Sequence, residues 1–511
     1  MWQIERAPRI PTADFERFIA TLNASADFFW HDTPVTVARA PGRLDLMGGI
    51  ADYSGSLVLE LPLGVATFAA VQPDDAPLLT IRSLEPGLET PECVLPLDTL
   101  FPQGQPLDYA SASALLNVDQ RTAWAAYVAG VLVVLARERG LLPTGGLRIL
   151  IDSAVPAGKG VSSSAAIEVA TMSAILGVSG QRSAVSGQNS ELNPEPRTLT
   201  PRDIALLCQT VENLVVGAPC GVMDQMTSAL GEQDQLLALL CQPAEVLGNV
   251  VLPPDLTVWG IDSGIRHAVT GADYGSVRIG AFMGRRMLSE GRNFNHEAHE
   301  EHEGLGEAGY LANISPSLWE QQLRELVPIE ISGAAFLARY GETGDTVTTV
   351  DPSRTYAVRQ PTAHPIYENH RVQLFRALLT DDERRRTEDE RRRAFVFRPS
   401  SFVDPRNTLL GELMFQSHAS YSACGLGSTG TDRLVELVRG ERANGLYGAK
   451  ITGGGSGGTV AVLGRSDAGD TVRRLAERYA TETGRIPLVL DGSSPGATAW
   501  GVAQLHFVNM R

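Results

Sequence analysis

The chain has 511 residues, with 43 basic and 59 acidic side chains, a formal net charge of −16 and a pI near 5.1. This acidic balance argues against nucleic acid as a partner, because proteins that bind nucleic acid gain much of their affinity by neutralising phosphates. A hydrophobic content of 43% is that of an ordinary globular protein, and the length is sufficient for two or three domains.

Cysteine usage and hydropathy narrow the class of protein further. The five cysteines are widely spaced and contain no C-x-x-C pair, so we expect neither a disulfide framework nor a structural zinc site. Residues 1–17 lack the apolar segment of a secretion signal, and the longest apolar stretch, residues 128–136, is much shorter than the ~20 residues of a membrane span. These features predict a cytoplasmic protein that does not bind membranes.

The spacing of apolar residues predicts helices and strands along the whole chain. In the first half we expect a helix over 11–23, strands over 35–38 and 56–63, a helix over 121–137, a strand over 147–151, and helices over 164–176 and 204–216. In the second half we expect a strand over 258–262, helices over 277–288, 408–418 and 432–439, and a strand over 459–463. Residues 179–201 are polar and predict a surface connection, and residues 291–350 predict an insertion.

The segment PAGKGVSSSAA, residues 156–166, lies between a predicted strand and a predicted helix. A glycine-rich turn at a helix start presents backbone N–H groups and the positive end of the helix dipole to an anion, and serines add hydroxyls for phosphate or magnesium. It is not a Walker A loop, because no Ser or Thr follows Lys159. A flexible connector with a serine cap is the alternative, but the flanking strand and helix favour a phosphate site.

A second glycine-rich segment, GAKITGGGSGG, occupies residues 448–458. It matches G-x-G-x-x-G formally, but a dinucleotide-binding fingerprint opens a helix and this segment opens a strand. We expect a close backbone approach, either to a ligand or to the first loop; a simple hairpin is the alternative. The chain has only two lysines, Lys159 and Lys450, and both lie in these loops. Either the placement of both lysines in these loops is chance in an arginine-rich chain, or each loop binds a compact anion.

Two further segments bring carboxylates together. Residues 217–226, GAPCGVMDQM, contain Asp224 and follow the predicted helix that carries Glu212. Asp224 is either a helix cap or a reactive acid. In residues 39–53, the charged side chains of Arg43, Asp45 and Asp52 form either a buried ion network or a polar ligand site.

Two charged segments resemble functional motifs but have simpler interpretations. In residues 296–302, HEAHEEH, the histidines recur every three residues and not at the i, i+4 spacing of a zinc-binding helix, so we expect an exposed insertion. Residues 381–393 contain two arginine triplets among acids, which is typical of a solvent-facing helix.

In combination and in order, three of these segments resemble the motifs of the GHMP small-molecule kinases. Residues 40–62 are similar to the galactokinase signature, 156–166 to the phosphate loop and 448–458 to the third motif of the family. The resemblance extends from about residue 35 to the C-terminus. It implies a two-lobed α+β fold, with a ribosomal S5 domain 2-like N-terminal domain over 1–240 and a ferredoxin-like C-terminal domain over 241–511, and with the active site between them.

The same resemblance implies a sugar 1-kinase that uses ATP and Mg²⁺. Asp224 matches the catalytic aspartate, which accepts the proton of the anomeric hydroxyl, and Arg43 matches the arginine between this aspartate and the transferred phosphoryl group. Ser164 and Glu212 match the magnesium ligands. The positions assigned to ATP are Gly158, Lys159, Gly160, Ser162, Ser163, Ser164, Trp124 and Tyr127. The positions assigned to the sugar are Gly49, Ile50, Asp52, Gly221 and Tyr274.

Within the family, residues 48–56, 260–267 and 491–496 are similar to the L-arabinokinases, specifically to the kinase half of the plant enzymes. Where this chain has Gly49 and Ile50, galactokinases have Glu and His, which contact the 6-hydroxyl of the sugar. L-Arabinopyranose has the ring stereochemistry of D-galactose without the hydroxymethyl group, so the loss of these polar partners favours the pentose. The expected product is L-arabinose 1-phosphate.

The sequence is compatible with three other functions. The chain is a galactokinase if Gly49 and Ile50 are neutral changes. It is a uronic-acid 1-kinase if Arg266 or Arg278 pairs with the substrate carboxylate. A catalytically silent sugar sensor is disfavoured, because Arg43, Ser164, Glu212 and Asp224 are all present. The sequence predicts no particular oligomeric state, and it leaves open whether Lys159 and Lys450 contact ATP.

Overall fold

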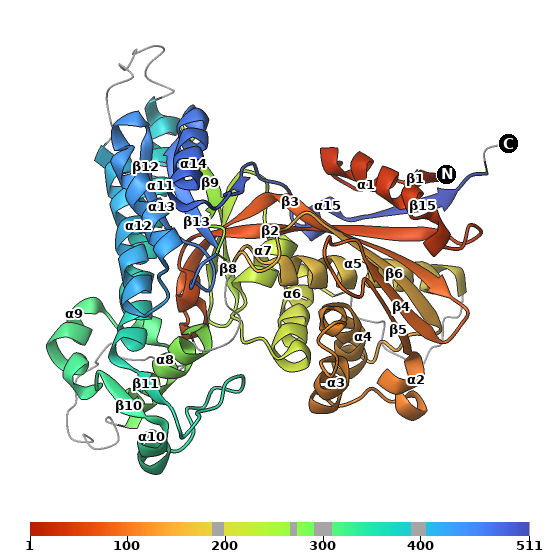
Figure 1. Cartoon of the computed structure of the whole chain (residues 1–511), viewed down its shortest axis with the longest axis horizontal. Helices are drawn as coiled ribbons and strands as arrows, with labels where there is room; N and C mark the ends of the chain where they lie inside the picture. The colour runs from red at the N-terminus through yellow and green to blue at the C-terminus, as the bar shows by residue number, and fades with distance from the viewer. Residues whose placement is uncertain (187–198, 266–272, 291–308, 390–404, 510–511) are drawn as a thin grey trace.

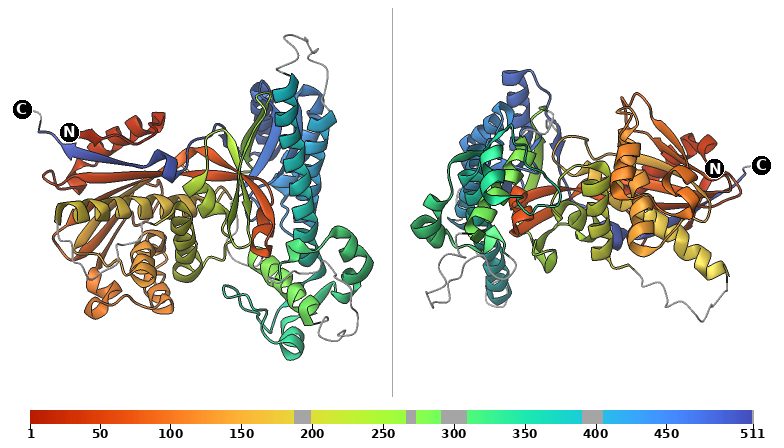
Figure 2. Two further views of the ribbon diagram at one scale, coloured as in Figure 1. Left: turned by 180° about the vertical axis from the view of Figure 1, so that it is seen from behind. Right: turned by 90° about the horizontal axis from the view of Figure 1, so that it is seen from below.

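The computed structural model describes residues 1–186, 199–265, 273–290, 309–389 and 405–509. It contains a larger and a smaller β-sheet, each covered by helices, with two long strands, β2 and β3, running along the larger sheet towards the smaller one (Figure 1). The view from behind shows the helices of the C-terminal part gathered at one end of the molecule (Figure 2).

The larger sheet has nine strands in the described chain, in the order β1-β15-β2-β3-β6-β4-β5, with β7 on β3 and β8 on β7. Its strands are β1 (Trp2–Arg6), β2 (Val35–Met47), β3 (Leu57–Asp74), β4 (Leu78–Ser83), β5 (Glu92–Pro96), β6 (Gly146–Ser153), β7 (Gln235–Leu240), β8 (Glu245–Val251) and β15 (Val502–Phe507). The strand pair β4–β6 is parallel, and the other pairs of this sheet are antiparallel.

Helix α5 packs across strands β2 and β3 and forms the centre of the first lobe. Short side chains on its inner face, such as Ala165, Ala166 and Ala170, are fully buried and let the helix approach the sheet closely. The other helices of this part are α1 (Ala13–Ala24), α2 (Leu97–Leu100), α3 (Tyr109–Leu116), α4 (Ala126–Arg139), α6 (Pro201–Thr210) and α7 (Met223–Leu230), and α5 itself spans Ser163–Ser186.

The smaller sheet is antiparallel, in the order β12-β13-β9-β14. Its strands are β9 (Leu256–Asp262), β12 (Leu446–Ile451), β13 (Thr459–Arg465) and β14 (Val489–Leu490). Helices α12 and α13 pack on β12. The helices of this part are α8 (Asp273–Glu290), α11 (Arg359–Asp389), α12 (Pro405–Ala423), α13 (Thr429–Gly440) and α14 (Gly469–Thr483). The short helix α15 (Ala497–Trp500) packs instead on α7 and β2 of the first part.

The described part of the predicted insertion, residues 309–350, belongs to a small unit beside α8 that continues past residue 350. This unit contains α9 (Pro316–Leu318), α10 (Gly333–Tyr340) and a hairpin of β10 (Glu330–Ser332) and β11 (Thr355–Ala357), packed around the buried Trp319, Phe336 and Tyr356. The described residues also form short 3-10 or π-helical turns: η1 (Ala26–Phe28), η2 (Gly49–Ser54), η3 (Pro102–Gly104), η4 (Ala123–Ala125), η5 (Val211–Val216), η6 (Leu311–Asn313), η7 (Trp319–Leu323), η8 (Arg324–Leu326) and η9 (Arg442–Asn444).

The two chain termini lie together at one end of the larger sheet, where β1 pairs with β15 and β15 pairs with β2 (Figure 1). The last strand of the chain therefore belongs to the sheet built mainly by the first half. The domain boundary predicted at residues 240 and 241 falls between β7 and β8, which pair with each other. This boundary stays a prediction.

Every predicted helix and strand has an observed counterpart, and most observed elements are longer. The helix predicted over 204–216 ends as an α-helix at Thr210 and continues as a π-helical turn, η5. Residues 296–302 lie outside the described residues, as do the side chains of residues 381–393. No helix in the described part of the chain is long and apolar enough to cross a membrane.

Candidate active site

Arg43 lies in the middle of β2, between two irregularities in its pairing with β3, one at residues 41–43 and one at 45–47. Such bulges redirect side chains out of the regular alternation. The guanidinium is buried and donates to Asp224 Oδ1 from Nε at 2.9 Å and to the Gly160 carbonyl from Nη1 at 2.8 Å. Glu60 Oε2, on β3, lies 3.3 Å from Arg43 Nε. Arg43 therefore connects the carboxylate of Asp224 to the first glycine loop.

The charge of Arg43 is held in place by its neighbours. Burial lowers the pKa of a guanidinium, but Asp224, Glu60 and Asp45 outweigh it, and the pKa of Arg43 is raised above its ordinary value. The surroundings of Glu60 instead favour its neutral form: burial, followed by the charge of Asp45, raises the pKa of Glu60 well above its ordinary value.

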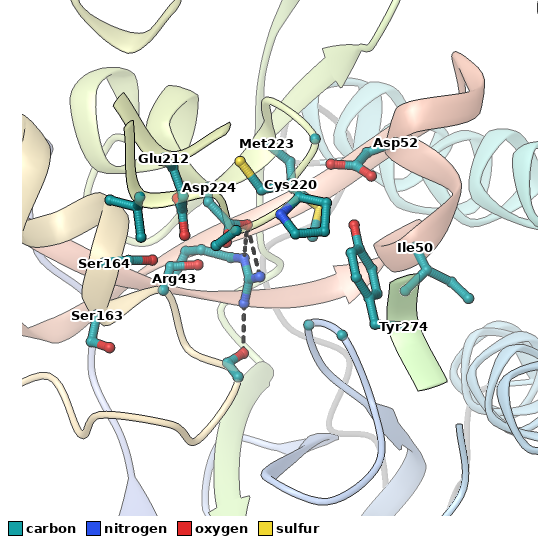
Figure 3. A pocket seen from close by; sticks show the side chains of 18 of the residues that line it. Arg43, Ile50, Asp52, Ser163, Ser164, Glu212, Cys220, Met223, Asp224 and Tyr274 are labelled. Carbon is teal, nitrogen blue, oxygen red and sulfur yellow. Dashed lines mark hydrogen bonds and ion pairs between the residues drawn. The ribbon is translucent and has the colours of Figure 1, made fainter. Parts of the chain in front are cut away.

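Asp224 is the second residue of helix α7, and its side chain is 19% exposed. It faces a cavity of about 570 Å³. Figure 3 shows Asp224 and Arg43 near the middle of this cavity, with Ser163, Ser164 and Glu212 on one side and Asp52, Tyr274 and Ile50 on the other.

The first glycine loop lies between β6 and α5, as predicted, so the N-terminus of the 24-residue helix α5 points its free N–H groups towards the cavity wall. Gly160 has φ of +70°, and a Cβ there would lie 3.0 Å from the Thr452 carbonyl. Gly453 also has φ of +70°, and a Cβ there would lie 2.6 Å from the Gly160 carbonyl. The two glycine loops are therefore in backbone contact, and Gly453 and Gly454 line the cavity beside the first loop.

Glu212 lies in η5, and π-helical turns of this kind are frequent at functional sites. Its Oε2 accepts a hydrogen bond of 2.6 Å from Gln225 Nε2, which also donates to Glu168 Oε2 at 3.3 Å. Burial, followed by the charge of Asp224, raises the pKa of Glu212 to about 7, although hydrogen bonds from Ser164 and Gln225 oppose the shift. Carboxylate and hydroxyl oxygens thus meet at the start of α5.

Asp52 lies in the turn η2 at the opposite side of the cavity, in contact with Gly221. A Cβ at Gly221 would lie 1.6 Å from Asp52 Oδ2, so only glycine fits at this position. Burial, followed by the charge of Asp224, raises the pKa of Asp52 to about 7. Tyr274, from α8, and Ile50 complete this side, which thus combines one carboxyl group with an apolar wall.

Most of the residues predicted from the sequence line this one cavity. They are Arg43, Ile50, Asp52, Tyr127, Gly158, Gly160, Ser162, Ser163, Ser164, Glu212, Gly221, Asp224 and Tyr274. Gly49, Trp124 and Lys159 do not line it. Gly49 is buried against Tyr421, and Trp124 Nε1 donates to the Thr90 carbonyl at 3.0 Å. Roles for these three in binding stay predictions.

The two lysines form ion pairs within the protein. Lys159 Nζ lies 2.8 Å from Asp262 Oδ2, at the end of β9, and Lys450 Nζ lies 2.5 Å from Asp45 Oδ2. Both side chains of the second pair are fully buried. The lysines therefore connect each glycine loop to another strand.

Several residues of the site were missed by sequence reasoning. Glu60, Glu168 and Gln225 are fully buried polar side chains. Glu60 lies beside Arg43, and Gln225 donates to both Glu212 and Glu168. Glu60 had a detectable signal, because it is a lone acid within the apolar run of residues 57–63. Cys220, Gly453 and Gly454 also line the cavity. They lie in segments that the sequence singled out, residues 217–226 and 448–458, but were not named individually as site residues.

Comparison with known proteins places the chain among kinases of one family. Residues 126–232 match the family described as GHMP kinases N terminal domain, residues 400–481 match GHMP kinases C terminal, and residues 26–73 match the galactokinase galactose-binding signature. The crystal structure of Lactococcus lactis galactokinase complexed with galactose superposes with a TM-score of 0.66 at 19% sequence identity, covering 94% of this chain and 99% of that chain.

Sequence similarity to characterised sugar kinases supports membership of the same family. The chain is 43% identical to L-arabinokinase of Arabidopsis thaliana over 96% of its own length, and it spans 49% of that plant protein. It is 29% identical to galactokinase of Chloroflexus aggregans and 27% identical to human galactokinase, covering 95% and 92% of those proteins and aligning over 92% and 90% of its own length. The chain belongs to the GHMP kinase family, and within it to the sugar kinases of the galactokinase and arabinokinase type. Membership of this family implies the use of ATP.

Proposed function

We propose that this chain transfers the γ-phosphoryl group of ATP to the anomeric hydroxyl of L-arabinose. The observation that carries the proposal is the placement of Asp224 and Arg43 in one cavity between a phosphate-type loop and a second wall formed by Asp52, Tyr274 and Ile50 (Figure 3). The identity of 43% to a plant L-arabinokinase supports the choice of sugar.

The residues around Asp224 suit phosphoryl transfer, which needs alignment and charge stabilisation more than covalent chemistry from the protein. In the proposed reaction Asp224 accepts the proton of the anomeric hydroxyl while that oxygen attacks the γ-phosphorus. Arg43 orients Asp224 through two hydrogen-bonding nitrogens and supplies a fixed positive charge next to it. The N-terminus of α5 and the loop serines hold the phosphates.

Mg²⁺ fits the oxygen ligands at the start of α5. This ion prefers one or two carboxylates together with substrate phosphates and water. Glu212 and Ser164, which line the cavity side by side with Ser163, would hold it. When bound, the ion neutralises charge on the transferred phosphates.

The wall at Ile50 supports a pentose as acceptor. Ile50 is apolar, and its neighbours Val277, Leu426 and Ile451 form a buried apolar cluster behind it. An apolar wall offers no partner to a 6-hydroxyl group, so D-galactose would leave that hydroxyl unsatisfied. The galactose-binding signature over 26–73 makes D-galactose the second candidate.

Uronic acids gain no support from Arg278. Both Nε and Nη2 donate to the carboxylate of Asp345, at 2.8 and 2.9 Å, and Nη1 donates to the Cys220 carbonyl at 3.1 Å. The charge of Arg278 is therefore already paired within the protein. Arg266 lies outside the described residues.

The proposal is tested by steady-state kinetics with purified protein, ATP and Mg²⁺, measuring ADP release with L-arabinose and with D-galactose. We expect kcat/KM for L-arabinose to exceed that for D-galactose by about tenfold or more, the range over which a pocket discriminates one small group. A preference for D-galactose would assign the chain to the galactokinases, and ADP release from neither sugar would overturn the proposal.

A further inference from the structure

The turn that presents Ile50 to the cavity is held by a series of buried hydrogen bonds. Three consecutive backbone N–H groups donate to side chains: Gly48 to Glu368 Oε1 at 3.2 Å, Gly49 to Asp45 Oδ1 at 3.0 Å, and Ile50 to Tyr421 Oη at 2.9 Å. Glu368 lies on α11 and Tyr421 on α12, so two of the three acceptors come from the C-terminal part of the chain. The conformation of this turn is thus fixed in part by side chains of α11 and α12, which are distant from it in sequence.

Tyr421 connects this turn to the second glycine loop. Its side chain is fully buried, and its hydroxyl accepts the Ile50 N–H and donates to the Gly453 carbonyl at 3.2 Å. The ring of His364 packs edge-on against the tyrosine ring, with centroids 5.2 Å apart, and Lys450 Nζ lies 5.2 Å from the centroid of the same ring. A ring enclosed in this way keeps its hydroxyl in one position.

The same hydroxyl excludes any side chain at position 49. A Cβ on Gly49 would lie 1.5 Å from Tyr421 Oη, and Gly49 has φ of +42°. The same Cβ would also lie 2.7 Å from Asp45 Oδ2, so it would meet two buried oxygen atoms. Ile50 is therefore the first side chain of this turn that reaches the cavity.

We propose that Tyr421 is a positioning residue that determines acceptor specificity: its hydroxyl fixes the backbone of Gly49 and Ile50 so that the isoleucine side chain closes the acceptor side of the cavity. Tyr421 itself does not line the cavity. This inference rests on the proposed sugar kinase function, and it assigns to α12 the control of discrimination between a pentose and the corresponding hexose.

The test is Tyr421→Phe, which keeps the ring and removes only the hydroxyl. Because the Ile50 N–H loses its acceptor, the wall becomes less fixed and rejects the larger sugar less well. We expect the ratio of kcat/KM for L-arabinose over D-galactose to fall about three- to tenfold, mainly through a lower KM for D-galactose, while KM for ATP stays within about twofold.

Tyr356→Phe is the matched control. Tyr356 is also buried, and its hydroxyl also accepts one backbone N–H, from Asp351 at 3.0 Å, but it lies in the small unit around α10 and away from the cavity. This control should leave the sugar ratio unchanged. If Tyr421→Phe melts at the temperature of the control and has the wild-type sugar ratio, the inference is wrong.

Gly49→Ala provides an independent measurement if Tyr421→Phe does not fold. The added methyl group would displace Tyr421 or the turn, so we expect KM for the sugar to rise about tenfold or more with little change in KM for ATP. An unchanged sugar KM in Gly49→Ala would contradict the inference.

Failure of the proposed function is distinguishable from failure of this inference. If the wild-type protein phosphorylates a different sugar, the substrate assignment fails, and the ratio is measured between that sugar and its analogue with or without the terminal hydroxymethyl group. If no sugar is turned over, the same ratio is taken from dissociation constants by calorimetry with L-arabinose and D-galactose. In each case a ratio that Tyr421→Phe leaves unchanged overturns the role of Tyr421.

Discussion

Arg43 and Asp224 illustrate how a buried charge acquires a function. The Arg43 guanidinium has lost its water, and the protein replaces that water with the carboxylate of Asp224, the carboxyl group of Glu60 and the Gly160 carbonyl. Arg43 and these partners are held in fixed positions, and a preorganised charge of this kind can stabilise a transition state electrostatically. The sequence motifs identified Arg43 and Asp224, but not the supporting Glu60.

Replacing Asp224 by asparagine tests its proposed role as base. Asp224→Asn keeps the size of the side chain and one oxygen for Arg43, but it removes the proton acceptor. We expect kcat to fall about 10²- to 10⁴-fold, with KM for both substrates within a few fold. The exposed Asp467, which does not line the cavity, serves as control, and Asp467→Asn should keep full activity. Asp224→Asn with wild-type kcat would exclude this residue as the base.

Because the pKa of Asp52 is raised to about 7, we expect the stability of the ligand-free protein to depend on pH. Burial raises the pKa of Asp52 in the folded state above the value in the unfolded chain, so the folded state is favoured most at low pH and loses that contribution as pH rises through about 7. Asp52→Asn should therefore stabilise the free protein more at pH 8 than at pH 5, by about 2–3 kcal/mol.

Thermal unfolding at the two pH values measures this difference. The exposed Asp75, changed to Asn, is the matched control and should show the same unfolding temperature relative to wild type at both. If Asp52→Asn gives no larger stabilisation at pH 8 than at pH 5, Asp52 is not a buried acid with a raised pKa.

At the scale of elements, sequence patterns located helices and strands well and their ends poorly. The strand predicted over 35–38 continues to Met47, because a bulge between Pro41 and Arg43 accommodates Gly42 without ending the pairing with β3. From sequence alone, a Pro-Gly pair predicts a turn. The helix predicted over 164–176 extends to Ser186, where polar residues give no hydrophobic period to follow.

The contact between the two glycine loops is a further property of elements. Lys159 binds Asp262, the Thr459 N–H donates to the Lys159 carbonyl at 3.0 Å, and a Cβ at Gly453 would collide with Gly160. The sequence left open whether the second loop approaches a ligand or the first loop. It approaches the first loop, and it also lines the cavity.

Gly453→Ala tests whether this contact shapes the phosphate loop. The added methyl group would push the Gly160 carbonyl away from Arg43, so we expect KM for ATP to rise about tenfold and kcat to fall as well. Gly484→Ala is matched in backbone conformation, with φ of +71°, but a Cβ there meets nothing within 4 Å. In both variants the alanine is strained by the positive φ, so a difference between them reports the loop contact. Equal KM for ATP in both would show that the contact has no effect on phosphate binding.

At the scale of the whole molecule, contacts distant in sequence hold the two sheets together. Asp45, on β2, and Lys450, on β12, form a fully buried ion pair between strands of different sheets, separated by 405 residues. No local pattern predicts such a pair, because neither side chain has a neighbour in sequence that signals its partner. The same is true of Tyr421 and of β15, which joins the larger sheet beside β2.

Lys450→Met tests the contribution of this pair to stability. It would leave the carboxyl group of Asp45 buried without its cation, and we expect a loss of about 3–5 kcal/mol in the free energy of unfolding. The double variant Asp45→Asn and Lys450→Met should recover much of that loss, because no unpaired charge remains. Lys159→Met is the control and should cost less, since the side chain of Lys159 is 19% exposed whereas that of Lys450 is fully buried. Equal losses for the two lysine variants in denaturant titrations would contradict this prediction.

The position of the transferred phosphoryl group is the most direct test of the proposed reaction. Purified protein is incubated with ATP, Mg²⁺ and L-arabinose labelled with ¹³C at C1, and the product is examined by NMR. We predict a phosphate ester whose phosphorus couples to the labelled carbon, together with an equal amount of ADP. Phosphorylation at another carbon, or ADP accompanied only by inorganic phosphate, would contradict the account.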